Sequence, residues 1–433
     1  MMGRPTGGQG KLFYVGLNLE DRVPEDHPLR RISRAIDFGF VRGRVAHLYG
    51  VNGNESVDPA LILRLMFLAF FERVVSEREL MRQLRLRLDW LWFCGLDLDS
   101  PVPDHSVLSK ARRRWGLEVF EEVFAHVLRA CVEAGLVGGE TLYADSTVLK
   151  ADASVDSRVP RGLWNQLERG LGPQGKGGGE NSDGDDDDDR GSAGEPARTP
   201  PPPQDTQAAA LPPPPAGRFN AAIVSTTDPD AATTRRRGRG VTLGYRDHCL
   251  VDDRRGIVVA TIAAPADYDD GAMLVPLLDS SRGVLGADPL EAVGDSAYGT
   301  RENVGALRER GIDPYLKPRP AKGDTRSWLE RMAAGCDPRR TLELMRRRLH
   351  VAEGRFAQAH TRHEHRRCRW RRRWRVQIQC YLVAAAQNLK KLAKALARNP
   401  RGAAQAAGAS RGSAGHIAPP RRSPLQSLLP APA

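Results

Sequence analysis

The chain has 433 residues, 40% of them hydrophobic, which allows two or three domains with sizeable cores and excludes a wholly disordered protein. Its formal net charge of +12 at pH 7 favours a polyanionic partner, with nucleic acid first. The sequence shows no secretion signal, no apolar run long enough for a membrane span and no CxxC pair among six scattered cysteines. We therefore expect a cytoplasmic, nucleoid-associated protein with reduced thiols.

Residues 1–137 are predicted to form an all-helical, DNA-binding domain. Asp58 and Pro59 mark the start of an apolar helix, because Asp caps a helix and Pro fits its first turn. Ser76, followed three residues later by Glu79, is typical of a capping box.

A turn at residues 103–106 precedes a predicted helix over 107–115 with a basic face. Two interpretations of this face remain open: a helix-turn-helix type of DNA contact, or a solvated basic face on a structural helix. The candidate DNA-binding residues on it are Lys110, Arg112, Arg113 and Arg114.

Two stretches are predicted to be disordered, a low-complexity linker over residues 158–240 and a tail over 398–433. The linker contains a Gly-rich run, two proline runs and five consecutive aspartates at 185–189. Few apolar residues there could offset the entropy of ordering. We interpret the aspartates as a solvated charge run, because adjacent disordered acids do not preorganise a metal site.

Residues 138–157 and 241–397 are predicted to form one α/β domain. Two short strand-like runs each end on a carboxylate, the first at Asp145 and the second at Asp295. A hairpin is expected between them because two strand-like runs flank a polar turn. The expected elements are strands over 140–147, 244–251, 256–263, 290–293 and 312–316, and helices over 273–278 and 301–310.

A third acid, Glu353, lies on a predicted helix over residues 341–359. Apolar residues at three-four spacing give this helix one apolar stripe: Leu342, Met345, Leu349, Ala352 and Phe356. Glu353 lies beside the stripe, with Arg346, His350 and His360 on the neighbouring face. Glu364 is a rival, but it lies in a run without apolar periodicity.

Residues 362–375 form the densest basic region, with eight arginines and two interleaved tryptophans. Guanidinium groups bind phosphates and indoles stack on exposed bases, so this region is a candidate nucleic-acid surface. A zinc site built from its histidines and Cys368 is disfavoured, because no second ligand pair has suitable spacing. The candidate contacts are Arg366, Arg367, Arg369, Trp370, Arg371, Arg372, Arg373, Trp374 and Arg375, together with Arg346 and His360 of the preceding helix. The apolar helix that follows is expected to be core.

In order and spacing, the chain resembles bacterial insertion-sequence transposases of the DDE class. The fragments that carry the resemblance are residues 57–59, 76–80, 103–109, 144–147, 226–231, 244–248, 294–298, 353–356 and 387–392. The resemblance implies a catalytic domain with a ribonuclease H-like mixed sheet flanked by helices, and an all-α N-terminal domain.

The resemblance also implies a mechanism and its residues. Asp145, Asp295 and Glu353 would be the catalytic, metal-binding triad, with Mg²⁺ or Mn²⁺ and two ions expected. The substrates would be double-stranded DNA of the terminal inverted repeats and of the target, cut and joined by a homodimer. Two alternatives remain: a metal-dependent nuclease of the same fold, and a catalytically decayed transposase that only binds DNA.

Three positions depart from the family pattern. A lysine that grips DNA is replaced by His360, and Leu349 stands where an arginine usually precedes the glutamate by four residues. Arg348 lies one residue away from that position, and the family tyrosine before it has no match. Weaker phosphate contacts are the expected consequence.

Overall fold

The computed structural model describes Met2 and residues 18–50, 55–170, 211–212, 219–235, 240–319, 325–333 and 336–398. The predictions for the aspartate run and for the tail beyond residue 398 lie outside these residues. All six cysteines lie within the described residues and are free thiols. Among the described helices, none is both long and apolar enough to cross a membrane.

The N-terminal region is helical, as predicted. Its elements are α1 (Leu19–Arg22), α2 (Pro28–Ala35), α3 (Phe40–Val45), η1 (Ala46–Leu48), α4 (Pro59–Phe71), α5 (Glu77–Leu84), α6 (Leu88–Cys94) and α7 (Ser106–Glu133). Both predicted helix starts are confirmed, since the Asp58 side chain accepts from the Ala60 amide and the Ser76 hydroxyl accepts from the Glu79 amide. The helix expected over 107–115 runs on to Glu133 across a kink at Gly116, whose φ of 69° suits glycine.

A mixed sheet forms the centre of the second region. Its strands are β1 (Thr141–Lys150), β4 (Ala232–Arg235), β5 (Val241–Asp252), β6 (Val258–Pro265), β7 (Glu291–Gly294) and β8 (Asp313–Leu316). The strands β6, β5 and β1 are antiparallel neighbours, whereas β1, β7 and β8 are parallel. This order, with β4 also pairing with β5, is that of a ribonuclease H-like sheet, which confirms the predicted fold class.

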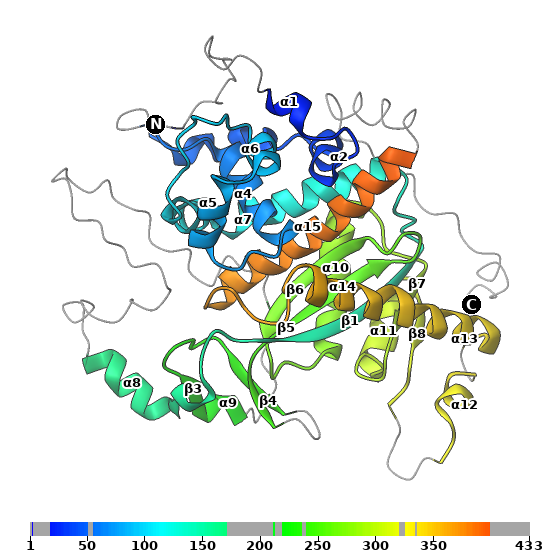
Figure 1. Ribbon diagram of the computed structural model, residues 1–433. Helices are drawn as coiled ribbons and strands as arrows, with labels where there is room; N and C mark the ends of the chain where they lie inside the picture. Colours follow the sequence, from blue (N-terminus) through cyan, green and yellow to red (C-terminus); the bar gives the residue numbers. More distant parts are fainter. Residues whose placement is uncertain are drawn as a thin grey trace.

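Helices cover both faces of this sheet (Figure 1). They are η4 (Gly271–Met273), α10 (Leu274–Leu285), α11 (Arg301–Glu309), α12 (Trp328–Ala333), α13 (Pro338–Arg348), a π-helical turn η5 (Leu349–Glu353), α14 (Gly354–Arg362) and α15 (Arg373–Arg398). On β1, Asp145 and Thr147 contact the α13–α14 helix, whereas Ser146 contacts Asp270 just before η4. Because successive strand residues face opposite sides, these two groups of helices cover opposite faces.

The long helix α15 joins the two regions. It packs against β6 of the sheet and against α2, α4 and α7 of the N-terminal region. Figure 1 shows it running between the N-terminal helices and the sheet. The predicted role of this segment as core is therefore confirmed, since its apolar residues from Val376 to Leu392 are buried.

The prediction of disorder over 158–240 is wrong at both ends of that stretch. Residues there form β2 (Arg158–Pro160), α8 (Arg161–Gly170), α9 (Phe219–Ala222), β3 (Ile223–Ser225) and β4, and η2 (Val155–Ser157) lies just before them. Asp228 and Asp230 accept from the backbone amides of Arg372 and Arg373 at 3.1 and 3.0 Å, so this segment caps the start of α15. These local contacts were hidden by the average composition of the whole stretch.

Gly244 allows β1 and β5 to approach closely. A Cβ built there would lie 2.0 Å from the carbonyl oxygen of Leu149. We expect Gly244→Ala to lower the free energy of unfolding by about 1–3 kcal/mol, because the two backbones must separate. Urea denaturation measures the change. The control is Gly283→Ala, where no atom lies within 4 Å and a small gain in stability is expected. Equal stabilities of the two variants would contradict the prediction.

Candidate active site

The register of the parallel pair β1 and β7 brings two of the predicted acids together. Tyr143 on β1 is paired with Val293 on β7. Asp145 and Asp295 each follow that pair by two residues, so Asp145 on β1 lies beside Asp295, which directly follows the end of β7. Asp145 lies in the middle of β1, not at its end as predicted, because β1 continues to Lys150.

The guanidinium of Arg348 contacts all three predicted acids. Its Nη2 lies 3.1 Å from Oδ1 of Asp145 and 3.6 Å from Oδ2 of Asp295. Its Nη1 lies 3.7 Å from Oε1 of Glu353. The structure thus gathers the two strand-borne aspartates and the helix-borne glutamate around one cation.

Burial differs among the three carboxylates. The Asp145 side chain is 12% exposed, whereas those of Asp295 and Glu353 are 41% and 54% exposed. Burial raises the pKa of Asp145 to about 6; Arg348 and the Ser146 amide oppose this rise, while Asp295 and Glu353 add to it. The cluster therefore has a closed inner end and an open outer end.

The charges of the cluster do not balance. Three carboxylates face one guanidinium, so the site retains an excess of negative charge. Carboxylate oxygens are the ligands that hard divalent cations prefer. The donor set and the unbalanced charge therefore fit one or more such ions, with Asp145, Asp295 and Glu353 as the residues that would hold them.

The π-helical turn η5 explains an apparent departure from the family pattern. A π-turn inserts one residue into a helix, and such turns are frequent at functional sites. Arg348 precedes Glu353 by five residues, and the turn between them brings both side chains to the same cluster. The predicted apolar stripe is wrong at Leu349, which is 51% exposed, because the buried position of that turn is taken by Arg348.

A second polar network supports the back of Asp145. Asp270 accepts from the Ser146 hydroxyl at 2.7 Å and from Arg246 Nη1 at 2.6 Å. His248 is fully buried with its Nδ1 3.4 Å from Asp270, and burial lowers its pKa to about 4, so it is neutral at pH 7. This network fixes the residue next to Asp145. The sequence analysis found it only as an unassigned fragment, residues 244–248.

A third network, fully buried, ties the helix after Glu353 to the sheet. Asp247 on β5 accepts from Arg355 Nη1 and contacts His365 Nε2, both at 2.9 Å, and Thr261 donates to it at 2.5 Å. Cys380 completes a group whose ligand atoms lie within 4.8 Å of one another, as a metal site would require. The Arg355 guanidinium already supplies the positive charge there, and it holds the pKa of Asp247 well below its usual range together with His365. We interpret this group as structural.

Removing the Asp247 charge should destabilise the protein. Asp247→Asn leaves the fully buried Arg355 without a counterion, and breaking a buried pair this way costs about 3–5 kcal/mol. Chemical denaturation measures the loss. The matched control is Asp279→Asn, which removes a surface partner of Arg310 and should cost less than about 1 kcal/mol. A loss at Asp247 as small as at Asp279 would rule out the assigned role.

The predicted nucleic-acid contacts divide into exposed and buried residues. The basic helix keeps an outward face, but Arg112 is 4% exposed, pairs with Glu77 and lies over the Trp370 ring at 4.1 Å. The exposed candidates are Lys110, Arg113, Arg114, Arg346, Arg366, Arg367 and Arg372, and the half-buried ones are His360, Arg369, Trp370, Arg371 and Arg375.

Three residues of the basic region turn inward instead of toward a ligand. Arg369 lies over the Phe70 ring at 4.0 Å and donates to the carbonyl of Val74 at 2.7 Å. Arg373 and Trp374 are each 7% exposed. The prediction that these side chains and Arg112 lie on a DNA-facing surface does not fit this placement, because Arg373 and Trp374 are buried and Arg112 and Arg369 lie over aromatic rings at the joint with the N-terminal helices.

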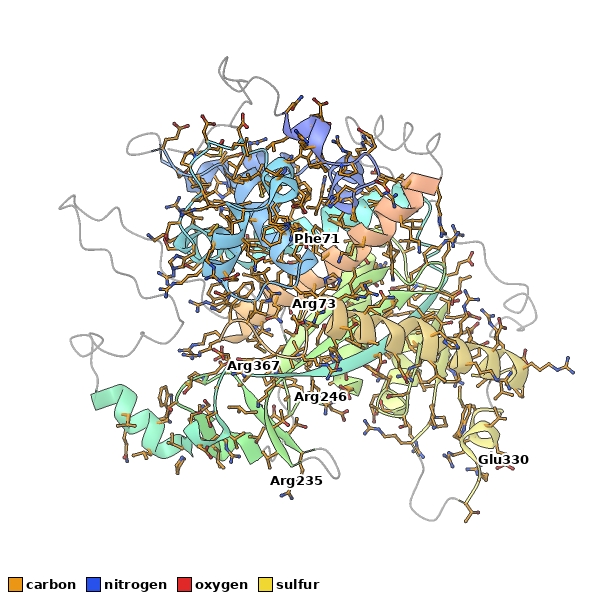
Figure 2. All side chains as sticks on the ribbon, in the orientation of Figure 1. Phe71, Arg73, Arg235, Arg246, Glu330 and Arg367 are labelled. Carbon is orange, nitrogen blue, oxygen red and sulfur yellow. The ribbon has the colours of Figure 1, made fainter. Side chains whose placement is uncertain are left out.

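The positions of His360 and Glu364 do not fit the roles considered for them, which were DNA contact for His360 and the third catalytic acid for Glu364. His360 Nε2 lies 3.3 Å from the Thr147 hydroxyl, and burial lowers the pKa of His360 to about 4, so its ring carries no charge for a phosphate at pH 7. Glu364 pairs with Arg73, which lies near the end of α4 (Figure 2). Glu353, not its rival, therefore belongs to the cluster around Arg348.

Comparison with known proteins gives the chain its family. A transposase domain (DUF772) matches residues 17–114, and a transposase DDE domain matches residues 221–389, so the two models together cover more than half of the chain. Asp295 and Glu353 lie inside the second match, whereas Asp145 lies outside both. No curated protein and no solved structure matches the chain. Proteins of this family are enzymes that act on DNA, depend on a divalent metal and catalyse DNA cleavage and transposition. The chain belongs to the insertion-sequence transposases of the DDE class.

Proposed function

We propose that this transposase cuts DNA at the ends of its own insertion sequence and joins the freed strand to target DNA. Asp145, Asp295 and Glu353 hold the metal, and the observation that carries this assignment is their convergence on Arg348. The metal is Mg²⁺ or Mn²⁺, and we propose two ions because both the attacking and the leaving oxygen need charge stabilisation.

Each side chain has a separate task in this proposal. The bound ions supply an activated water or 3′-hydroxyl and stabilise the leaving oxygen. Asp145 is the fixed inner ligand, held by the Ser146 amide at 2.9 Å and by burial. Asp295 and Glu353 stand at the open end, where DNA enters. Arg348 neutralises part of the acid cluster before the ions bind.

The DNA partner is bound along exposed cations, and the enzyme works as a homodimer. The exposed arginines of residues 366–372 and the exposed face of α7 supply these cations. A homodimer is proposed because two ends of one element must be processed together.

The test uses the purified protein with linear DNA that carries its terminal repeats. With Mn²⁺ or Mg²⁺ we expect 3′-hydroxyl cleavage products and strand-transfer products, and a chelator should abolish both. Hydrolysis without joined products would favour a nuclease of the same fold. Repeat binding without metal-dependent cleavage would favour a decayed, DNA-binding protein, the alternative that the neutral His360 supports.

A further inference from the structure

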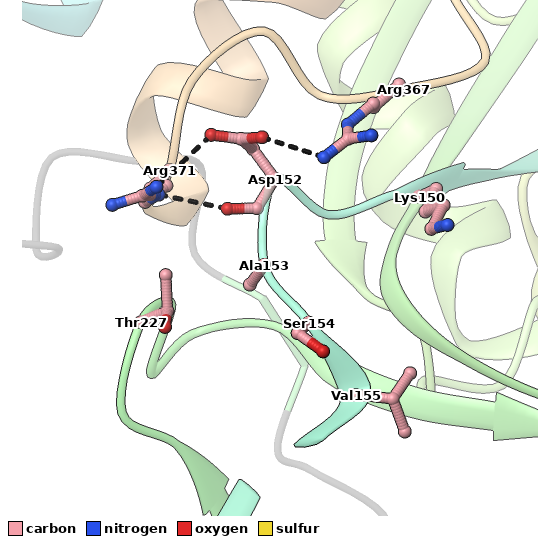
Figure 3. Close-up of a pocket in the computed structure, with 8 residues that line it drawn as sticks. All are labelled: Lys150, Asp152, Ala153, Ser154, Val155, Thr227, Arg367 and Arg371. Atoms are coloured by element: carbon pink, nitrogen blue, oxygen red, sulfur yellow. Dashed lines mark hydrogen bonds and ion pairs between the residues drawn. The ribbon is translucent and has the colours of Figure 1, made fainter. Parts of the chain in front are cut away.

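A basic groove lies at the far end of β1 from its N-terminus (Figure 3). Its cavity volume is about 520 Å³, within the range of sites that hold small ligands. Lys150, Arg367 and Arg371 are the cations that line it, and Asp152 is its one acid. None of the three assigned acids lines this groove, so it is separate from the metal-binding cluster.

The groove and the acid cluster share one edge of β1. The strand β7 pairs with β1 only over Thr141–Tyr143. Farther along the same edge, the Lys150 amide donates to the Arg366 carbonyl at 3.0 Å, and the Cys368 amide donates to the Lys150 carbonyl at 2.8 Å. The next amide, that of Ala151, points the other way and donates to the carbonyl of Leu243 on β5, as alternation along a strand requires.

This backbone pairing holds the arginines in place. Arg367 donates to Asp152 Oδ1 at 3.0 Å, and Arg371 lies 3.4 Å from Oδ2 of the same carboxylate. Arg371 Nε also donates to the Asp152 carbonyl at 2.9 Å. Figure 3 shows the two guanidiniums reaching Asp152 from different sides. They are therefore oriented before any ligand arrives, which lowers the entropy cost of binding.

The charges and shape of the groove define the ligand. Three cations against one carboxylate leave an excess of two positive charges, and the Arg367 side chain is 58% exposed. The groove is also lined by the small side chains of Ala153 and Thr227. Guanidinium and ammonium groups in such a setting suit phosphate oxygens.

We propose that this groove binds the sugar-phosphate backbone of the DNA strand that enters the acid cluster. The inference deepens the proposed function and rests on it. Lys150 follows Asp145 by five residues on β1, which is about 17 Å at strand rise, and the odd spacing puts its side chain on the opposite face of the sheet. The DNA strand would therefore pass around the shared edge of β1, and at 3.4 Å of axial rise per base pair the groove holds phosphates at least about five base pairs from the cut.

The test measures DNA binding in EDTA, where no cleavage occurs, with a linear duplex carrying the element end. The double variant Lys150→Ala/Arg367→Ala should bind about tenfold more weakly, and the slope of log affinity against log salt should flatten by about 1–2. Asp152→Asn should bind more tightly than wild type, because it removes the carboxylate that competes with phosphate. The control Arg282→Ala/Arg310→Ala removes two charges on α10 and next to α11 and should change neither quantity.

The outcomes separate the groove from the proposed function. If the double variant keeps the wild-type affinity and salt slope while the wild-type protein cleaves DNA in Mn²⁺, the proposal that the groove binds DNA is overturned. The proposed function is then unaffected. If the salt slope flattens in the double variant but the wild-type protein does not cleave DNA, the proposal that the groove binds DNA is supported and the proposed function is rejected.

Discussion

Asp145→Asn should lower the rate of metal-dependent DNA cleavage at least about a thousandfold, or about 4 kcal/mol of transition-state stabilisation. The amide keeps the size of the carboxylate but loses the charge that would hold a divalent ion at the closed end of the cluster. The rate is measured with saturating Mn²⁺ and DNA bearing the terminal repeats.

A measurement of the melting temperature distinguishes a loss of catalysis in Asp145→Asn from a loss of folded protein. Burial raises the pKa of Asp145 to about 6, above its ordinary value near 4, so the folded state disfavours the charged form at pH 7. Asp145→Asn should therefore keep or raise the melting temperature of the metal-free protein while activity falls. The control is Asp288→Asn, an acid that pairs with Arg282 on the outside of α10. Cleavage near the wild-type rate in Asp145→Asn would end the triad assignment.

Arg348→Ala should raise the affinity for Mn²⁺ by about tenfold or more. A positive charge within 4 Å of three carboxylates repels an incoming cation by roughly several kcal/mol before screening, so its removal favours the ion. The same change should lower the melting temperature of the metal-free protein, because three like charges then face one another. Calorimetry in the absence of DNA measures both quantities without reference to activity.

The matched control for Arg348 is Arg339→Ala. Arg339 lies on the same helix and is exposed, and the predicted metal ligands do not include it. It should leave Mn²⁺ affinity and melting temperature unchanged. If Mn²⁺ affinity instead falls in Arg348→Ala, the guanidinium orients the carboxylates for the ion and does not compete with it.

The order of elements could be predicted because each has a local sequence signal. Alternating residues indicated the strands that carry Asp145 and Asp295, and capping residues marked the starts of α4 and α5. Their fit to one family pattern then gave the fold class. The parallel register that aligns the two aspartates is a tertiary property, and its prediction depended on the resemblance.

The position of Arg348 could not be predicted from helical periodicity. A regular helix rotates by about 100° per residue, so the stripe was drawn through Leu349. The π-helical turn η5 shifts by one residue the position that faces the sheet. No residue type in the sequence predicts such a turn. Arg348, one residue from the position where the family arginine was expected, therefore reaches the acid cluster.

The arginine-rich region shows a second limit of sequence analysis. A run of arginines indicates positive charge but not the direction in which each side chain points. Arg112 and Arg369 pack their guanidiniums against Trp370 and Phe70. Such contacts join segments that are far apart in the chain. Composition therefore overestimated the number of side chains available to a nucleic acid.

The position of α15 has a consequence for synthesis on the ribosome. This helix contributes buried side chains to both the sheet and the N-terminal helices, yet it follows all the other described elements along the chain. Most of the chain must leave the exit tunnel before either half can bury its apolar surface. Products of premature termination before residue 373 should consequently be degraded or aggregate.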